Sequence, residues 1–367
     1  MPANSTSEDI GHMRHALRLA ARALGQAAPN PAVGCVIVSR EGHVVGRGWT
    51  QPGGRPHAEA EALAQAGHLA QGGTAYVTLE PCAHHAQTPP CADALIAAGL
   101  ARVVGATEDP DIRVNGQGFG RLEAAGVPVT RGPCEADART VNAGFFNARL
   151  RKRPLVALKI AESADGFVAD ANGNSRWITS DIARQHGHLL RARHEAILTG
   201  IGTVLADDPL LTCRLAGLEH RSPVRAVVDT RLRLPASSQL ARTARSRRVI
   251  VFTAEKTGGE DLAALGVEIM RVEKDAAGRV DLTAVLAHMA VLTRVLVEGG
   301  PALNASLLNL GAADIVHLYR APIVLGAGSR SALGSLDRGG LGTAPKLRLT
   351  AREQLGPDVL ESFEVTG

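Results

Sequence analysis

Two stretches in the first half of the chain, HAEAEALAQAG (57–67) and EPCAHHAQTPPCADALI (80–96), decide the fold predicted for this half. The first is rich in Ala, Glu and Leu and ends in glycine, a pattern typical of a helix. In the second, Cys82 and Cys91 each follow a proline, and Cys91 opens a further helical pattern. We therefore expect His57 and Cys91 at the amino ends of helices, where a partial positive charge stabilises thiolates.

His57, Cys82 and Cys91 are the ligand types of a catalytic zinc site, in which three protein ligands leave the fourth position to water. Zinc lowers the pKa of that water to about 7. Glu59, two residues after the histidine, is placed to take the water proton and return it to the substrate without binding the metal. The order H-x-E, then P-C, then C is the signature of zinc deaminases. We expect one zinc ion per chain.

Three other interpretations remain open from the residues alone. His84 or His85 would add a fourth ligand and make the zinc site structural. A zinc-stabilised binding protein without catalysis is a second interpretation, although it would have no use for the carboxylate of an H-x-E motif. A zinc deaminase that acts on nucleic-acid bases, with the second half of the chain as a binding domain, is the alternative function.

The composition argues against nucleic-acid binding and against secretion. Lys and Arg total 40 and Asp and Glu total 36, which leaves a net charge of +4, too small for a polyanion-binding surface. Aromatic residues, on which single-stranded nucleic acids stack, make up 3% of the chain. The five cysteines do not resemble a disulfide framework, and no stretch is typical of a signal peptide or a membrane span. We expect a cytoplasmic homo-oligomer without nucleic-acid or membrane partners.

Strand and helix patterns alternate around the two opening stretches and predict a layered α/β sheet. Ser7 is the expected N-cap of the first helix. The expected helices cover residues 8–24, 57–67, 91–99 and 121–125, and the expected strands cover residues 32–38, 43–49, 74–79, 101–107 and 127–130. A basic run ending in proline, residues 148–154, is the expected linker between a domain of residues 1–147 and a domain of residues 155–367.

The second half has its own strand series and one loop typical of a phosphate site. In VLVEGGPALNASLL (295–308), a buried strand is followed by two glycines and by Pro301, which can open a helix whose N-terminus faces an anion. TGIGTVLADDP (199–209) lacks the third glycine of the dinucleotide fingerprint, which disfavours a Rossmann fold. Strands are expected over residues 155–161, 195–200, 224–229, 247–254, 267–272, 293–300 and 314–326.

Eight residues separate Cys82 from Cys91, against two in the common deaminase signature, and this spacing points to a narrower family. Together with APNPAVGCVIV (28–38), HAEAEAL (57–63) and EDP…VNGQG (108–118), it resembles the deaminase half of the bifunctional riboflavin-biosynthesis deaminase/reductase. Four further stretches resemble the reductase half of that enzyme: LKIAESADGFVA (158–169), SRWITS (175–180), LRARHEAILTGIGTVLADDPLLTCR (190–214) and VEGGPALNASLL (297–308). The likeness runs from about residue 10 to residue 330, in the right domain order.

The resemblance implies a fold and two reactions. The fold is an N-terminal cytidine-deaminase-like three-layer α/β/α domain followed by a C-terminal dihydrofolate-reductase-like α/β domain. The first domain would hydrolyse the amine from the pyrimidine of 2,5-diamino-6-ribosylamino-4(3H)-pyrimidinone 5′-phosphate. The second would use NADPH to deliver hydride to ribosyl C1′ and open the sugar to a ribityl chain. The expected partner is therefore a phosphorylated pyrimidine.

The resemblance also implies the residues that contact substrate and cofactor. In the first domain, the substrate contacts fall on Asn30 and His84. In the second, the substrate contacts fall on Ser175, Arg191, Leu211, Arg214 and Glu298, and the cofactor contacts fall on Ala161, Trp177, Thr203, Asp207, Thr230, Gly300, Pro301, Ala302, Leu303, Asn304, Ala305 and Ser306. Arg191 and Arg214 suit a 5′-phosphate through charge-assisted hydrogen bonds. Lys159 could polarise or protonate the opening sugar.

The chain departs from the family pattern at two places. The family usually has Gly and then a basic residue after the second histidine, where this chain has Ala86-Gln87, so a possible phosphate contact is lost. Ala164 stands where the family usually has Leu, which predicts looser local packing.

Overall fold

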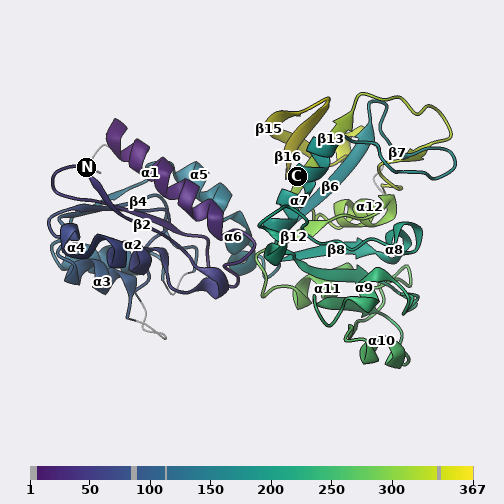
Figure 1. Ribbon diagram of the computed structural model, residues 1–367, viewed down its shortest axis with the longest axis horizontal. Coiled ribbons are helices and arrows are strands. Elements are labelled where there is room, and N and C mark those ends of the chain that lie inside the picture. The colour runs from purple at the N-terminus through teal and green to yellow at the C-terminus, as the bar shows by residue number, and fades with distance from the viewer. Residues whose placement is uncertain (1–5, 84–88, 112–113, 337–339, 367) are drawn as a thin grey trace. The chain divides into compact units, whose positions relative to one another are not determined.

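The computed structural model describes residues 6–83, 89–111, 114–336 and 340–366. The chain divides into two compact units, Met1–Arg153 and Pro154–Gly367, and each has its own sheet (Figure 1). Residues 148–150 of the expected linker are helical, because the last helix of the first unit extends to Leu150. No helix formed by the described residues is long and apolar enough to cross a membrane.

The sheet of the first unit has five strands in the order β2-β1-β3-β4-β5. Strand β1 is antiparallel to both β2 and β3, whereas β3, β4 and β5 are parallel. The strands are β1 (Gly34–Val38), β2 (Val44–Trp49), β3 (Thr74–Val77), β4 (Arg102–Gly105) and β5 (Val129–Arg131). Each lies within or beside a segment expected to be a strand, and the expected hairpin is formed by β1 and β2.

Helices cover both faces of this sheet, which makes three layers. They are α1 (Ser7–Ala20), α2 (Ala58–Ala66), α3 (Cys91–Ala97), α4 (Gln117–Ala124), α5 (Glu135–Val141) and α6 (Ala143–Leu150). Cys35 and Ile37 of β1 pack into a core with α2, α3 and α4. Val36 and Val38, which alternate with them along the strand, pack into a second core with α1 and α5.

Three sequence expectations about these helices were wrong. The first α-helix ends at Ala20, a 3₁₀ turn over Ala21–Ala23 continues it to within one residue of the expected end, and Thr6 caps it in place of Ser7. Helix α4 begins at Gln117, four residues earlier than expected, because Gly116 adopts the left-handed conformation that ends the preceding turn. Helices α5 and α6 were not predicted at all.

A buried carboxylate ties the first turn of α1 to the sheet. The Thr6 side chain accepts the Asp9 N–H and the Asp9 carboxylate accepts the Thr6 N–H, which forms a capping box. The same carboxylate accepts the Tyr76 hydroxyl at 3.0 Å and two nitrogens of Arg102 at 2.9 and 3.0 Å. Asp9 thereby joins α1 to β3 and β4.

We expect Asp9→Asn to destabilise the first unit by about 2–3 kcal/mol at pH 7. Burial alone would raise the pKa of Asp9, but the hydrogen bonds from Arg102 and its neighbours lower it to about 2. Since the pKa is about 3.9 in the unfolded chain, the stabilisation is present above that value and is lost as the pH falls through 2. Urea unfolding followed by Trp49 fluorescence measures it, in a Trp177→Phe background that removes the second of the two tryptophans.

The loss caused by Asp9→Asn should shrink by about half at pH 3, because part of the carboxylate population is then protonated in both states. A loss of equal size at pH 7 and pH 3 would instead assign the effect to packing of the amide.

The sheet of the second unit has nine strands in the order β11-β10-β9-β8-β12-β6-β13-β16-β15. Neighbours from β11 to β13 are parallel, and β16 is antiparallel to both β13 and β15. The strands are β6 (Leu155–Ser163), β8 (Ala196–Gly200), β9 (Val224–Val228), β10 (Val249–Thr253), β11 (Glu268–Arg271), β12 (Arg294–Val297), β13 (Ile315–Ala321), β15 (Lys346–Leu355) and β16 (Asp358–Thr366). Every expected strand is present, and the closing hairpin of β15 and β16 was not predicted.

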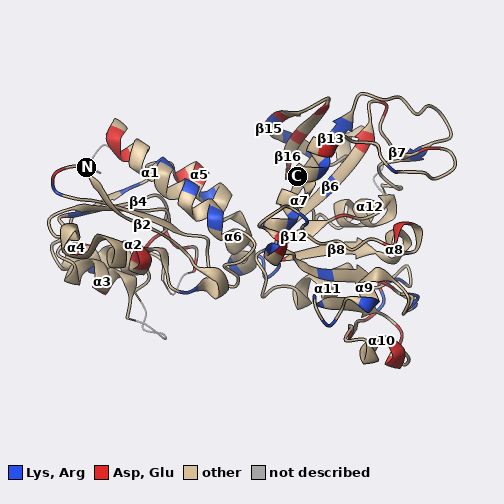
Figure 2. Ribbon diagram, viewed as in Figure 1, with Lys and Arg blue, Asp and Glu red and all other residues tan. Residues whose placement is uncertain are grey.

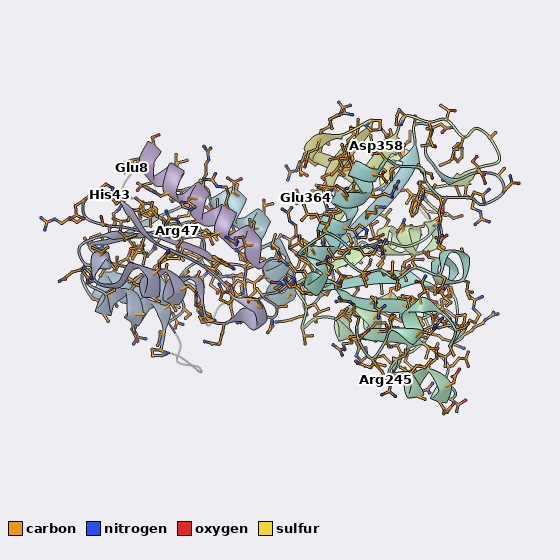
Figure 3. The ribbon with its side chains drawn as sticks, viewed as in Figure 1. Glu8, His43, Arg47, Arg245, Asp358 and Glu364 are labelled. Carbon is orange, nitrogen blue, oxygen red and sulfur yellow. The ribbon has the colours of Figure 1, made fainter. Side chains whose placement is uncertain are left out.

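The helices of this unit also lie on both faces of its sheet. They are α7 (Asp181–Ala192), α8 (Ile201–Asp207), α9 (Gln239–Arg242), α10 (Glu260–Ala264), α11 (Leu282–His288) and α12 (Pro301–Asn309), and a separate small sheet pairs β7 (Phe167–Ala169) with β14 (Arg330–Ser331). Leu158 and Ile160 of β6 pack with α11 and α12 in the main core. Lys159, between them, faces Gly187 of α7, and Asp358 of β16 accepts two hydrogen bonds from Ser180, the N-cap of α7 (Figure 3).

Charged residues of both signs are interspersed along both units (Figure 2). This distribution agrees with the small net charge of +4. All five cysteines are free thiols.

Candidate active sites

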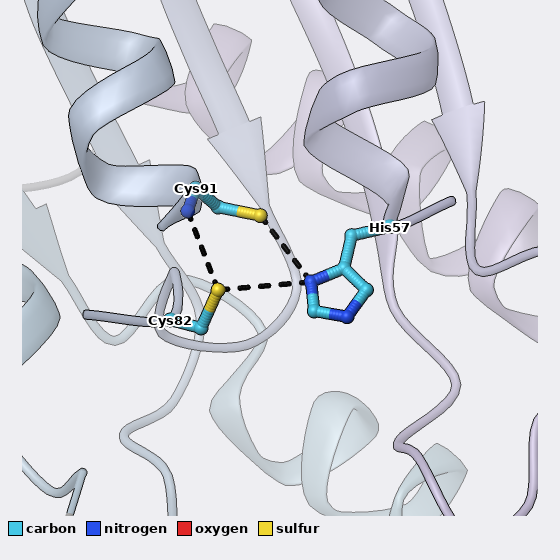
Figure 4. A group of neighbouring side chains, drawn as sticks. All are labelled: His57, Cys82 and Cys91. Atoms are coloured by element: carbon cyan, nitrogen blue, oxygen red, sulfur yellow. Dashed lines mark hydrogen bonds between the residues drawn. The ribbon is translucent and has the colours of Figure 1, made fainter. Parts of the chain in front are cut away.

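The three expected zinc ligands lie together at the amino ends of α2 and α3 (Figure 4). His57 is the residue before α2, Cys91 is the first residue of α3, and Cys82 lies in the loop after β3. The Nδ1 atom of His57 is 3.3 Å from Cys91 Sγ and 3.7 Å from Cys82 Sγ. Tetrahedral zinc would separate nitrogen from sulfur by about 3.6 Å, so these side chains fit one zinc ion.

The cluster stabilises a thiolate through its own hydrogen bonds. The pKa of Cys82 falls to about 4 because the Cys91 thiol, His57 and the Cys91 backbone N–H, at 3.3 Å, all donate to its sulfur. The same hydrogen bonds raise the pKa values of His57 and of the Cys91 thiol. Zinc binds the thiolate form of cysteine, and the site therefore offers one thiolate before any metal arrives.

Among the residues that the structure describes, three side chains make up this cluster. His84 and His85, the candidates for a fourth ligand, and Ala86-Gln87 lie outside the described residues. The expected contact of His84 with substrate also falls there.

Glu59 lies in the first turn of α2, beside the metal ligands, and is 3% exposed. Burial, reinforced by the negative charge of Cys82, raises its pKa to about 7. Together with His57, Cys82 and Asn30, Glu59 lines a cavity of about 360 Å³. A carboxyl group that titrates near neutrality can both accept and donate a proton at this place.

Asn30, the other expected substrate contact of this domain, is held at the cavity wall by a close backbone approach. Its Nδ2 donates to the Gly54 carbonyl at 2.9 Å. Gly54 has a φ of 86°, and a Cβ atom there would lie 2.1 Å from Asn30 Nδ2. Only glycine permits this arrangement.

Glu80 anchors the segment after β4 that forms part of the cavity wall, a role that the sequence did not indicate. Its carboxylate accepts the backbone N–H groups of Asp109 at 3.1 Å, Gly116 at 3.0 Å and Gly118 at 2.7 Å. A Cβ atom at Gly118 would lie 1.9 Å from the carbonyl oxygen of Pro81. The glycine-rich VNGQG motif is therefore explained by this contact. In the sequence, the only indication of this role of Glu80 was the VNGQG motif itself.

The second unit contains a cavity of about 610 Å³ that collects most of its expected site residues. Those that line it are Lys159, Ala161, Ser175, Trp177, Arg191, Thr203, Asp207, Leu211, Arg214, Glu298, Gly300, Pro301 and Asn304. Thr230, Ala302, Leu303, Ala305 and Ser306 do not line it. Within α12, neighbouring residues face different ways: Asn304 lines the cavity, whereas Leu303 packs into the core.

An ion pair occupies the centre of this cavity wall. Arg191 donates to Glu298 through Nε at 2.6 Å and Nη2 at 2.8 Å, and through Nη1 to the Thr212 carbonyl at 2.9 Å. The two side chains are 14% and 15% exposed. Burial alone would raise the pKa of Glu298, but Arg191 and then Lys159 lower it to about 2. Glu298 is therefore held as a carboxylate.

The phosphate contact of Arg191 stays a prediction. Its three guanidinium nitrogens each donate within the protein, which uses three of the five N–H groups of the side chain. Arg214 lines the same cavity and is exposed. It has no hydrogen bond or ion pair to any described residue. All the N–H groups of its guanidinium are therefore available to an anion.

Lys159 approaches this ion pair from β6. Burial lowers its pKa, while the negative charge of Glu298 favours its charged form. Its Nζ atom lies 5.4 Å from the centre of the Tyr319 ring, within cation–π range. The lysine thus faces the cavity with a carboxylate and an aromatic ring beside it.

Several residues of this cavity escaped the sequence reasoning. Arg176 donates to the Asp207 carbonyl at 2.5 Å, and the Arg184 guanidinium lies 4.5 Å from the centre of the Trp177 ring. His188 contacts the Thr212 carbonyl at 3.1 Å, and burial, with Arg191 beside it, lowers its pKa to about 4. These residues adjoin the recognised motifs but bear no pattern of their own.

Comparisons with known proteins match both units. Two family models match: the cytidine and deoxycytidylate deaminase zinc-binding region over residues 6–107, and the RibD C-terminal domain over residues 154–360. The riboflavin biosynthesis protein RibD of Aquifex aeolicus is 38% identical over 97% of this chain and 98% of its own length.

Solved structures agree over nearly the full length. RibD of Acinetobacter baumannii is 38% identical with a TM-score of 0.87, and it covers 98% of this chain and 99% of its own. The diaminohydroxyphosphoribosylaminopyrimidine deaminase/5-amino-6-(5-phosphoribosylamino)uracil reductase of Thermotoga maritima is 33% identical with a TM-score of 0.86 and the same coverage. These matches confirm the expected fold class.

Proposed function

Because the chain belongs to the RibD family, the bifunctional zinc-dependent deaminases and NADPH-dependent reductases of riboflavin biosynthesis, we propose that its two cavities act in turn on one phosphorylated pyrimidine. The first cavity hydrolyses the amine of 2,5-diamino-6-ribosylamino-4(3H)-pyrimidinone 5′-phosphate, and the second reduces the ribosyl group to ribityl. The observation that most strongly supports this assignment is the three-ligand cluster with a buried glutamate beside it. The same chain has a second cavity, and Lys159 and Glu298 are among the residues that line it.

In the deaminase cavity, His57, Cys82 and Cys91 would hold the zinc ion, which when bound would supply hydroxide at neutral pH. Glu59 takes the proton of the attacking water and returns it, first to the ring nitrogen and then to the departing amine. Its pKa of about 7 suits both directions of transfer. Asn30 contacts the pyrimidine from the cavity wall.

In the reductase cavity, bound NADPH would supply the hydride for ribosyl C1′. As the bond between C1′ and the ring oxygen breaks, Lys159 donates a proton to that oxygen, which becomes a hydroxyl of the ribityl chain. Arg191 orients Glu298 through its two-nitrogen hydrogen bond, and the carboxylate favours the charged form of the lysine against the effect of burial. Arg214, which has no partner among the described residues, binds the 5′-phosphate.

The remaining cofactor contacts follow the turn at the start of α12. Gly300, Pro301 and Asn304 line the cavity, where the amino end of a helix suits the pyrophosphate of NADPH. Trp177, 66% exposed at the opposite wall, offers an aromatic surface to the cofactor. Thr203 and Asp207 of α8 lie along the same wall.

We further infer that the enzyme works in the cytoplasm as a homo-oligomer. Free cysteines suit a reducing compartment. Strand β15 is a long edge strand with exposed Leu347 and Leu349, and such an edge favours pairing with a second copy. Light scattering coupled to size-exclusion chromatography measures the oligomeric state.

The test of the two-step function is NADPH oxidation with the diaminopyrimidine ribotide, with and without a zinc chelator. We expect the chelator to abolish oxidation when the diamino compound is supplied, because no deaminated intermediate forms. The same chelator should leave oxidation intact when the deaminated intermediate is supplied. Chelator-insensitive oxidation of the diamino compound, with no ammonia released, would contradict the proposed order of reactions.

A further inference from the structure

The deaminase cavity has an arginine that the zinc chemistry leaves unused. Arg149 of α6 lines the same cavity as Glu59. Its guanidinium carbon lies 5.1 Å from the centre of the Phe145 ring, and Phe145 lines the cavity as well. No hydrogen bond or ion pair joins Arg149 to any residue that the structure describes. A half-buried guanidinium at the cavity wall therefore has its hydrogen-bond donors available.

Four other arginines of the first unit, unlike Arg149, have carboxylate partners. The pairs are Arg102 with Asp9, Arg121 with Asp93, Arg131 with Glu123 and Arg139 with Glu135. Arg149 lines the cavity and, unlike those four arginines, gives no hydrogen bond to a described carboxylate.

The other charged groups of the cavity create a need for that charge. Glu59, Glu80, Asp109 and Asp111 also line it, and all are acidic. The carboxylate of Glu80 is compensated by backbone N–H groups, but a phosphate monoester, with a charge of about −2, would still meet a mainly acidic wall. A substrate of this kind needs a cation at its phosphate end, where arginine forms strong two-nitrogen hydrogen bonds.

Ala86 and Gln87, which stand between Cys82 and Cys91 in the sequence, have uncharged side chains and do not supply this cation. Arg149 comes from a different element, more than sixty residues later in the sequence. Arg55, at the same cavity, adds to the positive potential.

We propose that Arg149 binds the 5′-phosphate of the deaminase substrate and so makes this cavity specific for a nucleotide over a nucleoside or a free base. Phe145 orients the guanidinium, and the phosphate oxygens accept its N–H groups. This inference rests on the proposed deaminase function. It gives the reaction a specificity residue outside the zinc cluster and its neighbouring glutamate.

The test compares the diaminopyrimidine ribotide with its dephosphorylated nucleoside, and ammonia release without NADPH isolates the first reaction. We expect Arg149→Met to raise the KM of the ribotide about 10- to 100-fold, since a charge-assisted contact is lost. Its kcat should stay within about twofold, because Arg149 takes no part in the proton transfers of Glu59. The kcat/KM for the nucleoside should not change. Arg149→Lys, which keeps the charge, should restore part of the affinity.

Arg139→Met is the matched control. Arg139 also lies against a phenylalanine, 5.4 Å from the centre of the Phe146 ring, but it pairs with Glu135 and does not line the cavity. Its substitution should leave both substrates unaffected. An unchanged KM of the ribotide in Arg149→Met, or an equal loss on ribotide and nucleoside, would overturn the inference alone. Failure of the unsubstituted chain to release ammonia from either compound would overturn the proposed function and the inference with it.

Discussion

Glu59→Gln should lower the rate of deamination by about 10³-fold or more while the chain keeps one zinc ion. The carboxylate is 3% exposed, beside the three ligands but outside the ligand set, and its pKa of about 7 suits proton transfer. The amide has nearly the same shape but can neither take nor return the proton. Ammonia release and metal analysis of the purified protein measure the two quantities.

Glu61→Gln is the control for Glu59→Gln, because Glu61 lies on the same helix and does not line the cavity. It should retain full deaminase activity. Reduction of the deaminated intermediate should be normal in both variants, since the second cavity is made of residues from the other unit. Normal ammonia release by Glu59→Gln would refute the proposed proton transfer, and loss of zinc would show that the carboxylate helps to hold the metal.

Lys159→Met should lower the reductase rate by about 10²- to 10⁴-fold without loss of NADPH binding. Methionine fills the space of the buried stem but has no proton to give to the opening sugar and no charge to set against Glu298. The quantities to measure are NADPH oxidation with the deaminated intermediate and the dissociation constant of NADPH from a fluorescence titration.

The exposed Lys256 provides the control for Lys159→Met, since it lies outside the cavity. Lys256→Met should behave as the unsubstituted chain, and both variants should release ammonia normally. If Lys159→Met reduces the intermediate at the normal rate, another group donates the proton. A failure to bind NADPH would instead give Lys159 a role in cofactor binding.

Much of the local structure could be predicted from the sequence, because the signals lie within a few residues of one another. Strand patterns located every strand of the two main sheets except the closing hairpin, β15 and β16. Strand β15 was missed because it is almost entirely exposed and so has no buried face to produce an alternating pattern. Strand β16 has buried and half-buried residues in alternation, but no strand was expected there. Helices α5 and α6 lie where no helix was predicted, and the end of α6 falls in the expected linker.

The chemistry of the first cavity was also accessible to sequence reasoning. His57, Cys82 and Cys91 belong to motifs with fixed types and order, and a metal ion constrains those types strongly. What the motif could not indicate was the support around it. Glu80 gathers backbone N–H groups up to 39 residues away, and no local pattern distinguishes such a carboxylate from one exposed to solvent.

The sequence by itself determined which side chains this protein has for its two reactions and in which order along the chain they stand, because ligand types, prolines and helix starts are local properties. The tertiary structure alone decided how those side chains are used. Arg191 and Glu298 are 107 residues apart in sequence, and only the fold brings them together as an ion pair at the second cavity. Arg149, which no motif marked, lies at the deaminase cavity because α6 packs against that side of the sheet. Hydrogen bonds and charges act over a few ångströms in space, so partners distant in sequence are known only once the chain has folded.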